Sequence, residues 1–175
     1  MKTKETIVSE IKNATKRALD WFDAVPADKF FVRTVKTWSP SDNLDHLVRS
    51  LKSLNRVLKM PKSIVRMIFG QSNHPSRTYD EICKIYEERL AEGAQASGIY
   101  LPKQKSPDHV KKKKKELLLK FDEVSNSLLS SLKKWEDDEM DQYQLPHPLL
   151  GRLTIREMLF FSVYHTLRHA RVEGD

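Results

Sequence analysis

Apolar residues recur at steps of three and four along four long segments, and this periodicity constrains the fold more than any other feature. Such spacing is typical of amphipathic helices, which bury one face. In the first segment, residues 3 to about 23, the apolar face comprises Ile7, Ile11, Ala14, Ala18 and Trp21. No strand pattern competes with the helical one, apart from some alternation over residues 30–37. The chain is therefore predicted to be all-α, a four-helix bundle with short accessory helices.

Helix start signals precede the other three segments. Residues 39–42 (Ser-Pro-Ser-Asp) combine a cap, a first-turn proline and an acid, which predicts a second helix that ends near Pro61. The same order at residues 106–108 starts the longest helix, expected to run to about Asp138. A threonine and a glutamate with capping-box spacing, at 154 and 157, begin the closing helix. Shorter helical pieces are expected at residues 62–69 and from 79 to about 96.

Length and composition describe one domain, which we expect to span residues 1–175. The longest apolar run, residues 158–164, is far shorter than the roughly 20 residues of a membrane-spanning helix, so no membrane segment is predicted. The first residues are charged and lack the apolar stretch of a signal peptide. Cys83 is the only cysteine, expected to be a buried, inert thiol, and no internal disulfide can form. These features predict a cytoplasmic protein.

The net charge of +7 is concentrated in five consecutive lysines, residues 111–115. Five successive helical residues wrap around the axis, so they form no single basic face. Aromatic residues are not interleaved with them, as they are in many single-strand binding surfaces. A solvated helix start is therefore expected here, and nucleic acid is not an expected partner.

The six histidines fall into two groups. His74 and His147 precede prolines in loops, and His109 lies in the first turn of the lysine-rich helix, so these three are expected to be exposed. The other three are helical and lie beside apolar stripes: His46, His165 and His169.

Spacing brings two of the helical histidines together. His165 and His169 are four residues apart, so their imidazoles share one face of the closing helix. Facing helices of a bundle converge on the core, and His46 on the second helix can supply a third nitrogen ligand to one divalent metal ion. Three protein ligands leave coordination positions open for water or substrate. The spacing alone, however, also fits histidines that merely fill a core.

Two motifs favour the metal site. Residues 38–47 (WSPSDNLDHL) resemble the opening of the second helix in the DinB/YfiT-like superfamily, which has a tryptophan-serine pair and a histidine. Residues 147–154 (HPLLGRLT) are similar to that family's lead into its last helix, which carries an HxxxH pair like His165 and His169. The motifs occur in the family's order, and the resemblance covers nearly the whole chain in outline.

The resemblance implies an up-down-down-up four-helix bundle, often dimeric, with a divalent metal on His46, His165 and His169. Zinc and nickel are the expected ions. Iron and manganese are the next candidates, since imidazole does not discriminate sharply among these ions. Relatives include S-transferases and isomerases that use low-molecular-weight thiols, so a metal-dependent, thiol-dependent S-transferase is the leading hypothesis. The alternative is a non-catalytic metal-binding or stress-response module of unassigned role. A basic nucleic-acid-associated protein is a third and weaker hypothesis.

Neighbouring polar residues suggest how such a site would be supported. Metal-binding histidines need acceptors for their outer ring nitrogens, and Asp42 and Glu173 lie one turn from His46 and His169. Both acids also fit a solvated surface. Arg168 and Arg171 are candidates for holding an anionic thiol, although cations are ordinary at a helix C-terminus. A peptidase is disfavoured, because Thr166 stands where a metalloprotease carries its glutamate.

Overall fold

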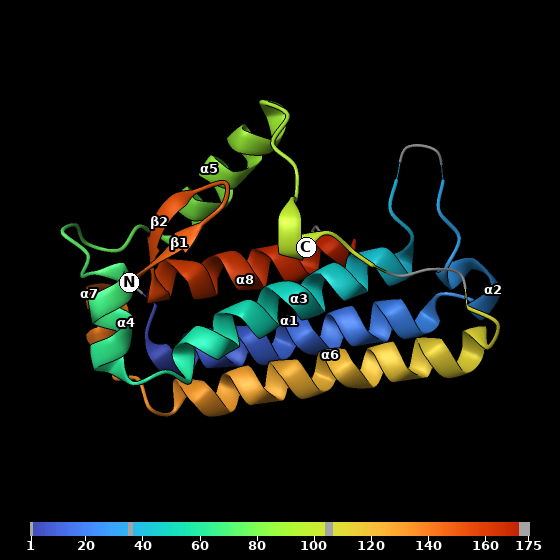
Figure 1. Cartoon of the computed structure of the whole chain (residues 1–175), viewed down its shortest axis with the longest axis horizontal. Coiled ribbons are helices and arrows are strands. Elements are labelled where there is room, and N and C mark those ends of the chain that lie inside the picture. Colours follow the sequence, from blue (N-terminus) through green and yellow to red (C-terminus); the bar gives the residue numbers. More distant parts are fainter. Residues whose placement is uncertain (1, 35–36, 104–106, 172–175) are drawn as a thin grey trace.

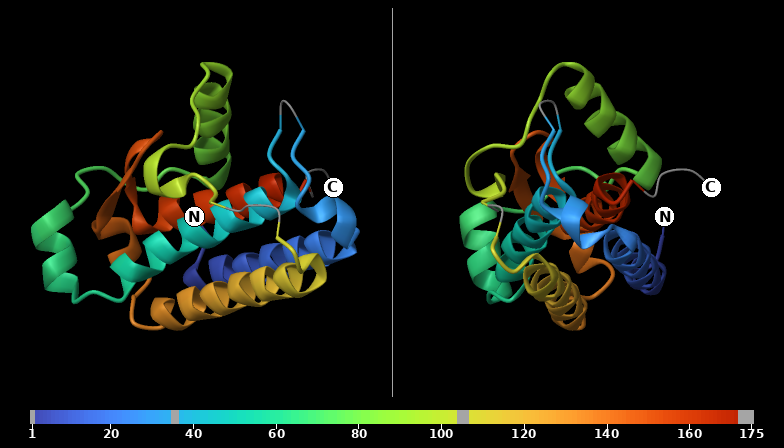
Figure 2. Two further views of the ribbon diagram at one scale, coloured as in Figure 1. Left: turned by 45° about the vertical axis from the view of Figure 1, so that its right-hand side comes forward. Right: turned by 90° about the vertical axis from the view of Figure 1, so that its right-hand side faces the viewer.

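Four long helices form the body of the protein in the computed structural model, which describes residues 2–34, 37–103 and 107–171 (Figure 1). They are α1 (Lys4–Ala24), α3 (Pro40–Leu58), α6 (Val110–Leu132) and α8 (Ile155–His169). Helices α1 and α8 run in one direction and α3 and α6 in the other, which is the predicted up-down-down-up order. The end-on view shows the four helices around a common core (Figure 2). The predicted all-α bundle is confirmed.

The predicted apolar faces build the core. Ile7, Ile11, Ala14 and Ala18 of α1 are buried as expected, and Phe22, rather than Trp21, completes the face. Opposite them, α6 contributes buried Leu117, Phe121, Leu128 and Leu132. Removal of these apolar surfaces from water is the main favourable term that holds the bundle together.

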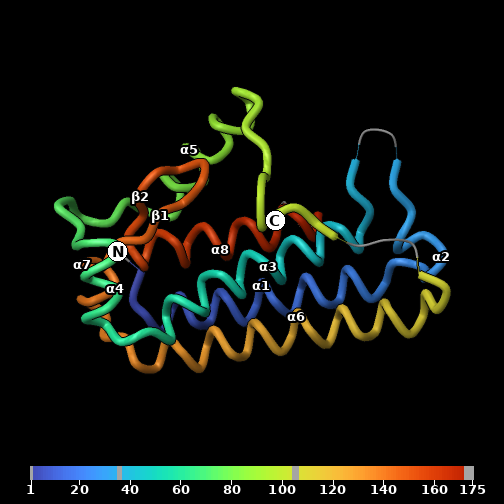
Figure 3. Tube along the Cα trace, viewed as in Figure 1, coloured from blue at the N-terminus to red at the C-terminus, as the bar shows by residue number. Residues whose placement is uncertain are grey.

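Short elements connect the long helices. They are α2 (Ala27–Phe30), α4 (Lys62–Phe69), α5 (Tyr79–Ala91), the 3-10 helix η1 (Gly98–Tyr100), α7 (Glu139–Gln142), β1 (Gln144–His147) and β2 (Gly151–Thr154). Helix α2 lies at one end of the bundle, α4 and α7 lie at the other, and α5, η1 and the β1–β2 hairpin lie along one side (Figure 1). The two strands pair antiparallel, with Leu145 opposite Leu153. Helix α5 and the hairpin stand over α8, on the side away from α6, and the chain returns through η1 to lie beside α3 (Figure 3).

Several boundaries differ from the sequence-based predictions. Helix α6 begins at Val110, with His109 as its N-cap, and ends at Leu132 instead of continuing to Asp138. It stops because the chain turns and inserts Trp135 into the core, where the indole N–H donates to Leu58 O at 3.1 Å. Helix α5 ends five residues early, at Ala91. Ser106, the expected cap of α6, lies outside the described residues.

The short elements α2, η1 and α7 and the β-hairpin were not predicted from the sequence, and the hairpin matters most for the site. Its strands have four residues each, too few for an alternating pattern to emerge, and Pro146 lies within the first. Gly151 accepts a φ of +73° where the hairpin turns back, a conformation that favours glycine. The hairpin ends at Thr154, whose side chain caps α8, so it fixes where the closing helix starts. Within the described residues, no helix combines the length and apolar character needed to span a bilayer.

Candidate metal centre

Two antiparallel helices bring three histidines together. His46 lies on α3, whereas His165 and His169 occupy successive turns of α8. One ring nitrogen from each lies within 4.8 Å of the others, and the Nε2 atoms of His46 and His165 are 3.0 Å apart. Because α3 and α8 run in opposite directions, the front half of one helix faces the last turns of the other. The three histidines are therefore close enough to bind one metal ion, as the sequence predicted.

Oxygen acceptors hold the outer ring nitrogens of two of these histidines. His46 Nδ1 donates to the backbone carbonyl of Tyr100 at 2.7 Å, and His169 Nδ1 donates to Asn43 Oδ1 at 2.6 Å. The orientation of the Asn43 amide is set by its own nitrogen, which donates to Ser39 O at 2.9 Å. Since carbonyl oxygens only accept, both Nδ1 atoms carry the proton. In the neutral rings, Nε2 is consequently the atom with a free lone pair.

This geometry fits a divalent ion held by Nε2 atoms. Two nitrogens each roughly 2.05 Å from a tetrahedral ion lie roughly 3.3 Å apart, close to the observed 3.0 Å between His46 and His165. Hydrogen bonds from the outer nitrogens to oxygen acceptors are the usual support of such ligands, because they fix tautomer and ring orientation. The helix-borne carbonyl acceptor, Asn43, is one residue that the sequence reasoning missed.

Burial keeps the three imidazoles neutral. Burial lowers the pKa of His46, and it lowers the pKa of His165 well below its usual value, with the neighbouring histidines adding to the effect. For His169, burial followed by the charges of His46 and Arg168 lowers the pKa to about 3. Neutral imidazole is the form that binds a metal, so the rings need lose no proton at neutral pH.

Asp42, one of the two acids expected to orient the histidines, does not do so. Asp42 turns away from His46, caps α3 by accepting the Ser39 backbone N–H, and pairs with Arg33 at 2.6 Å. Its capping position points its carboxylate toward the start of the helix, which is why spacing alone misplaced it. Glu173 lies outside the described residues.

Aromatic rings surround the histidines. Trp38 meets His46 edge-on with centroids 5.1 Å apart and stacks on His169 at 6.1 Å, while Phe161 stacks on His165 at 4.7 Å. The histidines line a cavity of about 940 Å³, large enough for a small-molecule substrate. A three-nitrogen site that opens on such a cavity can present a bound group to a second molecule.

His147 also lines this cavity, so the expectation that it is a simple exposed loop residue was wrong. Its ring packs edge-on against Phe161 with centroids 4.3 Å apart, and burial lowers its pKa to about 4. The backbone N–H groups of Leu149 and Leu150 each donate to its Nδ1 at 3.2 Å. The hairpin turn creates this arrangement. Because the sequence did not predict the hairpin, it gave no sign that His147 would face the cavity. His74 and His109 are exposed, as expected.

Cys83 takes no part in this site. It is half-buried on α5, and burial together with nearby carboxylates raises the pKa of its thiol to about 11. The thiol is therefore protonated at neutral pH, in agreement with its predicted inertness.

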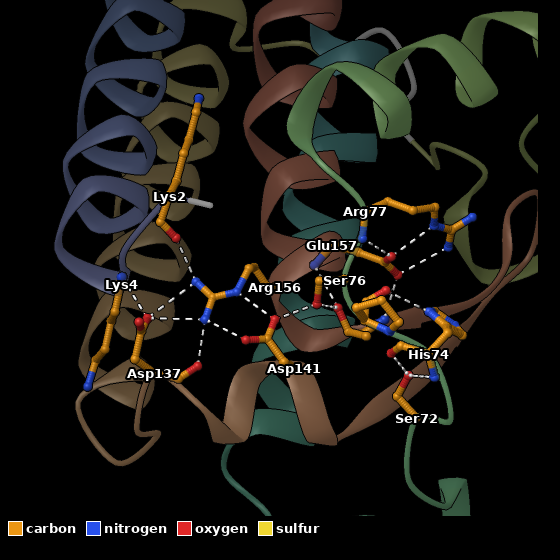
Figure 4. Close-up of polar contacts among 12 residues, drawn as sticks. Lys2, Lys4, Ser72, His74, Ser76, Arg77, Asp137, Asp141, Arg156 and Glu157 are labelled. Carbon is orange, nitrogen blue, oxygen red and sulfur yellow. Dashed lines mark hydrogen bonds and ion pairs between the residues drawn. The ribbon is translucent and has the colours of Figure 1, made fainter.

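A second polar cluster lies at the other end of α8, where Arg156 is buried (Figure 4). Its guanidinium donates to Asp141 Oδ1 at 2.6 Å, to the Asp137 carbonyl at 2.6 Å and to the Lys2 carbonyl at 2.7 Å. This residue therefore ties the N-terminus of the chain and the α7 region to the start of α8. Such a saturated set of donors is typical of a structural anchor.

Glu157, the next residue, is fully buried and equally well paired. Its carboxylate accepts from the side chain and backbone N–H of Arg77, both at 2.8 Å, and from the Thr154 N–H at 2.8 Å. Burial alone would raise the pKa of Glu157, but these donors outweigh it and hold the pKa below its ordinary value. Arg77 and Glu157 thereby fasten the loop before α5 to α8 (Figure 4).

Comparison with known families agrees with the geometry. A sequence model described as the DinB superfamily matches residues 10–172, which include all three histidines and nearly the whole bundle. Neither the curated proteins nor the solved structures yielded a match. The family match, the bundle order and the converging histidines identify this chain as a member of the DinB superfamily.

Proposed function

We propose that the protein is a metal-dependent enzyme in which His46, His165 and His169 hold one divalent ion. Zinc and nickel are the preferred candidates, and iron and manganese come next. The observation that carries this proposal is the convergence of one nitrogen from each ring within 4.8 Å, with two outer nitrogens fixed by oxygen acceptors. An all-imidazole set suits zinc and nickel, and three neutral ligands leave the charge of the ion undiminished. The single cysteine, which cannot pair within the chain, supports a cytoplasmic location.

The proposed reaction is S-transfer from a low-molecular-weight thiol. When bound, the ion would lower the pKa of a thiol beside it, so that thiolate is available at neutral pH. The sulfur would attack an electrophilic carbon, forming a carbon–sulfur bond while the bond to the leaving group breaks and that group departs with its electron pair. The cavity is large enough for both molecules, and the aromatic rings of Trp38, Tyr86 and Phe161 line it beside the histidines. Arg168 and Arg171 line the same cavity and can attract the anionic thiol.

Metal analysis of protein purified without a histidine tag tests the site. We expect about one divalent ion per chain, and an affinity loss of at least about 100-fold for His46→Ala or His165→Ala, since each removes a ligand. His74→Ala is the matched control, because His74 is exposed and far from the triad in the described structure. Circular dichroism would show whether the variants stay helical. Equal metal content in all four proteins would refute the site.

Catalysis needs its own measurement. The metal-loaded protein should accelerate the disappearance of a small thiol in the presence of an alkylating electrophile, and the chelated protein should not. Full metal occupancy with no acceleration for a panel of thiols would support the non-catalytic binding module instead. Unfolding on chelation would indicate that the ion is structural.

A further inference from the structure

The cavity extends well beyond the histidines. Its wall follows α3 from His46 to Val57, a length of about 16 Å at 1.5 Å per residue. On the facing helix it follows α8 back from His169 to Met158, because the two helices are antiparallel. The histidines thus occupy one end of an elongated trough, and its lining continues along both helices away from them.

The far part of the trough is mainly apolar, although Ser50 and Ser53 of α3 also line the cavity. Its wall there comprises Leu51, Leu54 and Val57 of α3, Phe69 of α4, Leu145 of β1 and Met158 of α8. These residues come from four different elements and share only their hydrophobic character. A hydrophilic thiol gains little from contact with such a surface, whereas an apolar chain binds more tightly as it buries more of its surface there.

Charge distinguishes the two ends. No aspartate, glutamate or lysine lines the cavity within the described residues, and the charged side chains that do so there are Arg168 and Arg171. Arg168 lies between His165 and His169 on α8, and Arg171 comes two residues after the helix ends, so the positive charge lies at the histidine end. This end favours an anionic group and disfavours a cationic one.

Polar residues also line the trough between its ends, and His147 is one of them. His147 Nδ1 accepts two backbone N–H groups, so the proton of the neutral ring resides on Nε2. Among the described residues, Nε2 has no hydrogen-bond partner in the protein. It therefore offers a fixed donor to an oxygen atom of a molecule that lies along the trough.

From these observations we infer that the cavity binds an elongated, largely apolar molecule with one anionic head, the head at the histidine–arginine end and the chain along the trough. This inference rests on the proposed function, in which the molecule would be the second substrate beside the small thiol. It narrows the class of substrate to amphipathic acids, a class that the three histidines alone do not specify.

Calorimetric titration with straight-chain carboxylates tests this class. Affinity should rise roughly two- to fourfold per methylene from acetate through hexanoate to decanoate. Decylamine, with the same chain and the opposite charge, should bind about tenfold or more weaker than decanoate. Affinities that do not depend on chain length, or equal binding of decylamine and decanoate, would overturn the inference.

Substitutions in the cavity wall test where decanoate binds. Val57→Glu places a carboxylate in the apolar wall and should weaken decanoate binding by at least about tenfold. Lys52→Gln is its control: it changes the charge by the same amount on the same helix, at an exposed position outside the cavity. If circular dichroism shows that Val57→Glu does not fold, Leu90→Glu introduces the same charge from α5 on another wall. Unchanged decanoate affinity in a folded wall variant would overturn the inference.

The metal-free and zinc-loaded proteins should both be titrated. Dependence on chain length in the metal-free protein would support the amphipathic-acid class even if metal binding, and with it the proposed function, failed. Normal metal binding without dependence on chain length in either form would leave the metal site intact and overturn the inference alone.

Discussion

The two ends of α8 handle buried polar groups in opposite ways. In the first turn, Arg156 and Glu157 keep their charges, and each is surrounded by partners from other elements (Figure 4). In the last turns, His165 and His169 are neutral, and their inner nitrogens face one another and a cavity. One end thus has complete internal pairing, whereas the other keeps lone pairs directed at a common point.

This difference separates anchoring from function on a single helix. A buried charge is tolerated only when it is paired, so the first turn is evidence about how the chain is held together. A buried neutral imidazole costs less, and its uncommitted nitrogen remains available for a ligand. The start of α8 fixes the position of the helix, and that position aims the histidines at α3.

The largest effect is expected when Glu157 is replaced, and this replacement tests whether the first turn of α8 anchors the helix. Glu157→Ala should lower the free energy of unfolding by about 3–5 kcal/mol, because the Arg77 guanidinium and two backbone N–H donors lose their partner. Urea denaturation followed by circular dichroism measures this loss. Glu157→Gln keeps the volume and some acceptors, so it should cost less. A loss below about 1 kcal/mol for the alanine variant would show that the first turn is not the anchor.

Removal of Asn43 probes the other end. Asn43→Ala deprives His169 of its acceptor, so metal affinity should fall about 10- to 100-fold while the protein stays folded. Asn43→Asp retains an acceptor oxygen and should restore most of the affinity. Competition with a chromogenic chelator gives both values. Unaltered affinity in the alanine variant would mean that this hydrogen bond does not support the proposed ligand.

The sequence predicted the bundle from local periodicity, whereas the histidine triad was predicted from spacing together with the two motifs that resemble the DinB superfamily. It could not place the support of the triad. Tyr100 supplies a backbone carbonyl, which any residue type can provide, so no sequence pattern marks it. Asp42 has the right spacing but a capping geometry, and His147 is drawn into the cavity by a hairpin whose strands are too short to predict. Long-range contacts of this kind become visible only in three dimensions.

Acid should weaken the first turn of α8 through Glu157. The folded-state pKa of Glu157 lies below its ordinary value of 4.5, so its full stabilisation is present above pH 4.5. As the pH falls below that value, the unfolded chain takes up the proton first and stability is lost, with a slope of at most about 1.4 kcal/mol per pH unit for each carboxylate. Urea denaturation at a series of pH values measures the slope. Glu157→Gln should flatten the profile, and a profile identical to that of the parent protein would contradict the assignment.

The lysine run repeats the contrast between paired and solvated charge on a smaller scale. Lys114 is largely covered, with its side chain 11% exposed, and its ammonium donates to the Asp23 and Val25 carbonyls at 2.6 and 2.8 Å, where α1 ends. Lys112 is exposed. Lys114→Ala should therefore cost about 1 kcal/mol in thermal or urea unfolding, and Lys112→Ala less than about 0.5 kcal/mol. Equal costs would mean that the run acts as a uniform solvated charge, because only a specific cap at the end of α1 can make one lysine of the five differ from its neighbours.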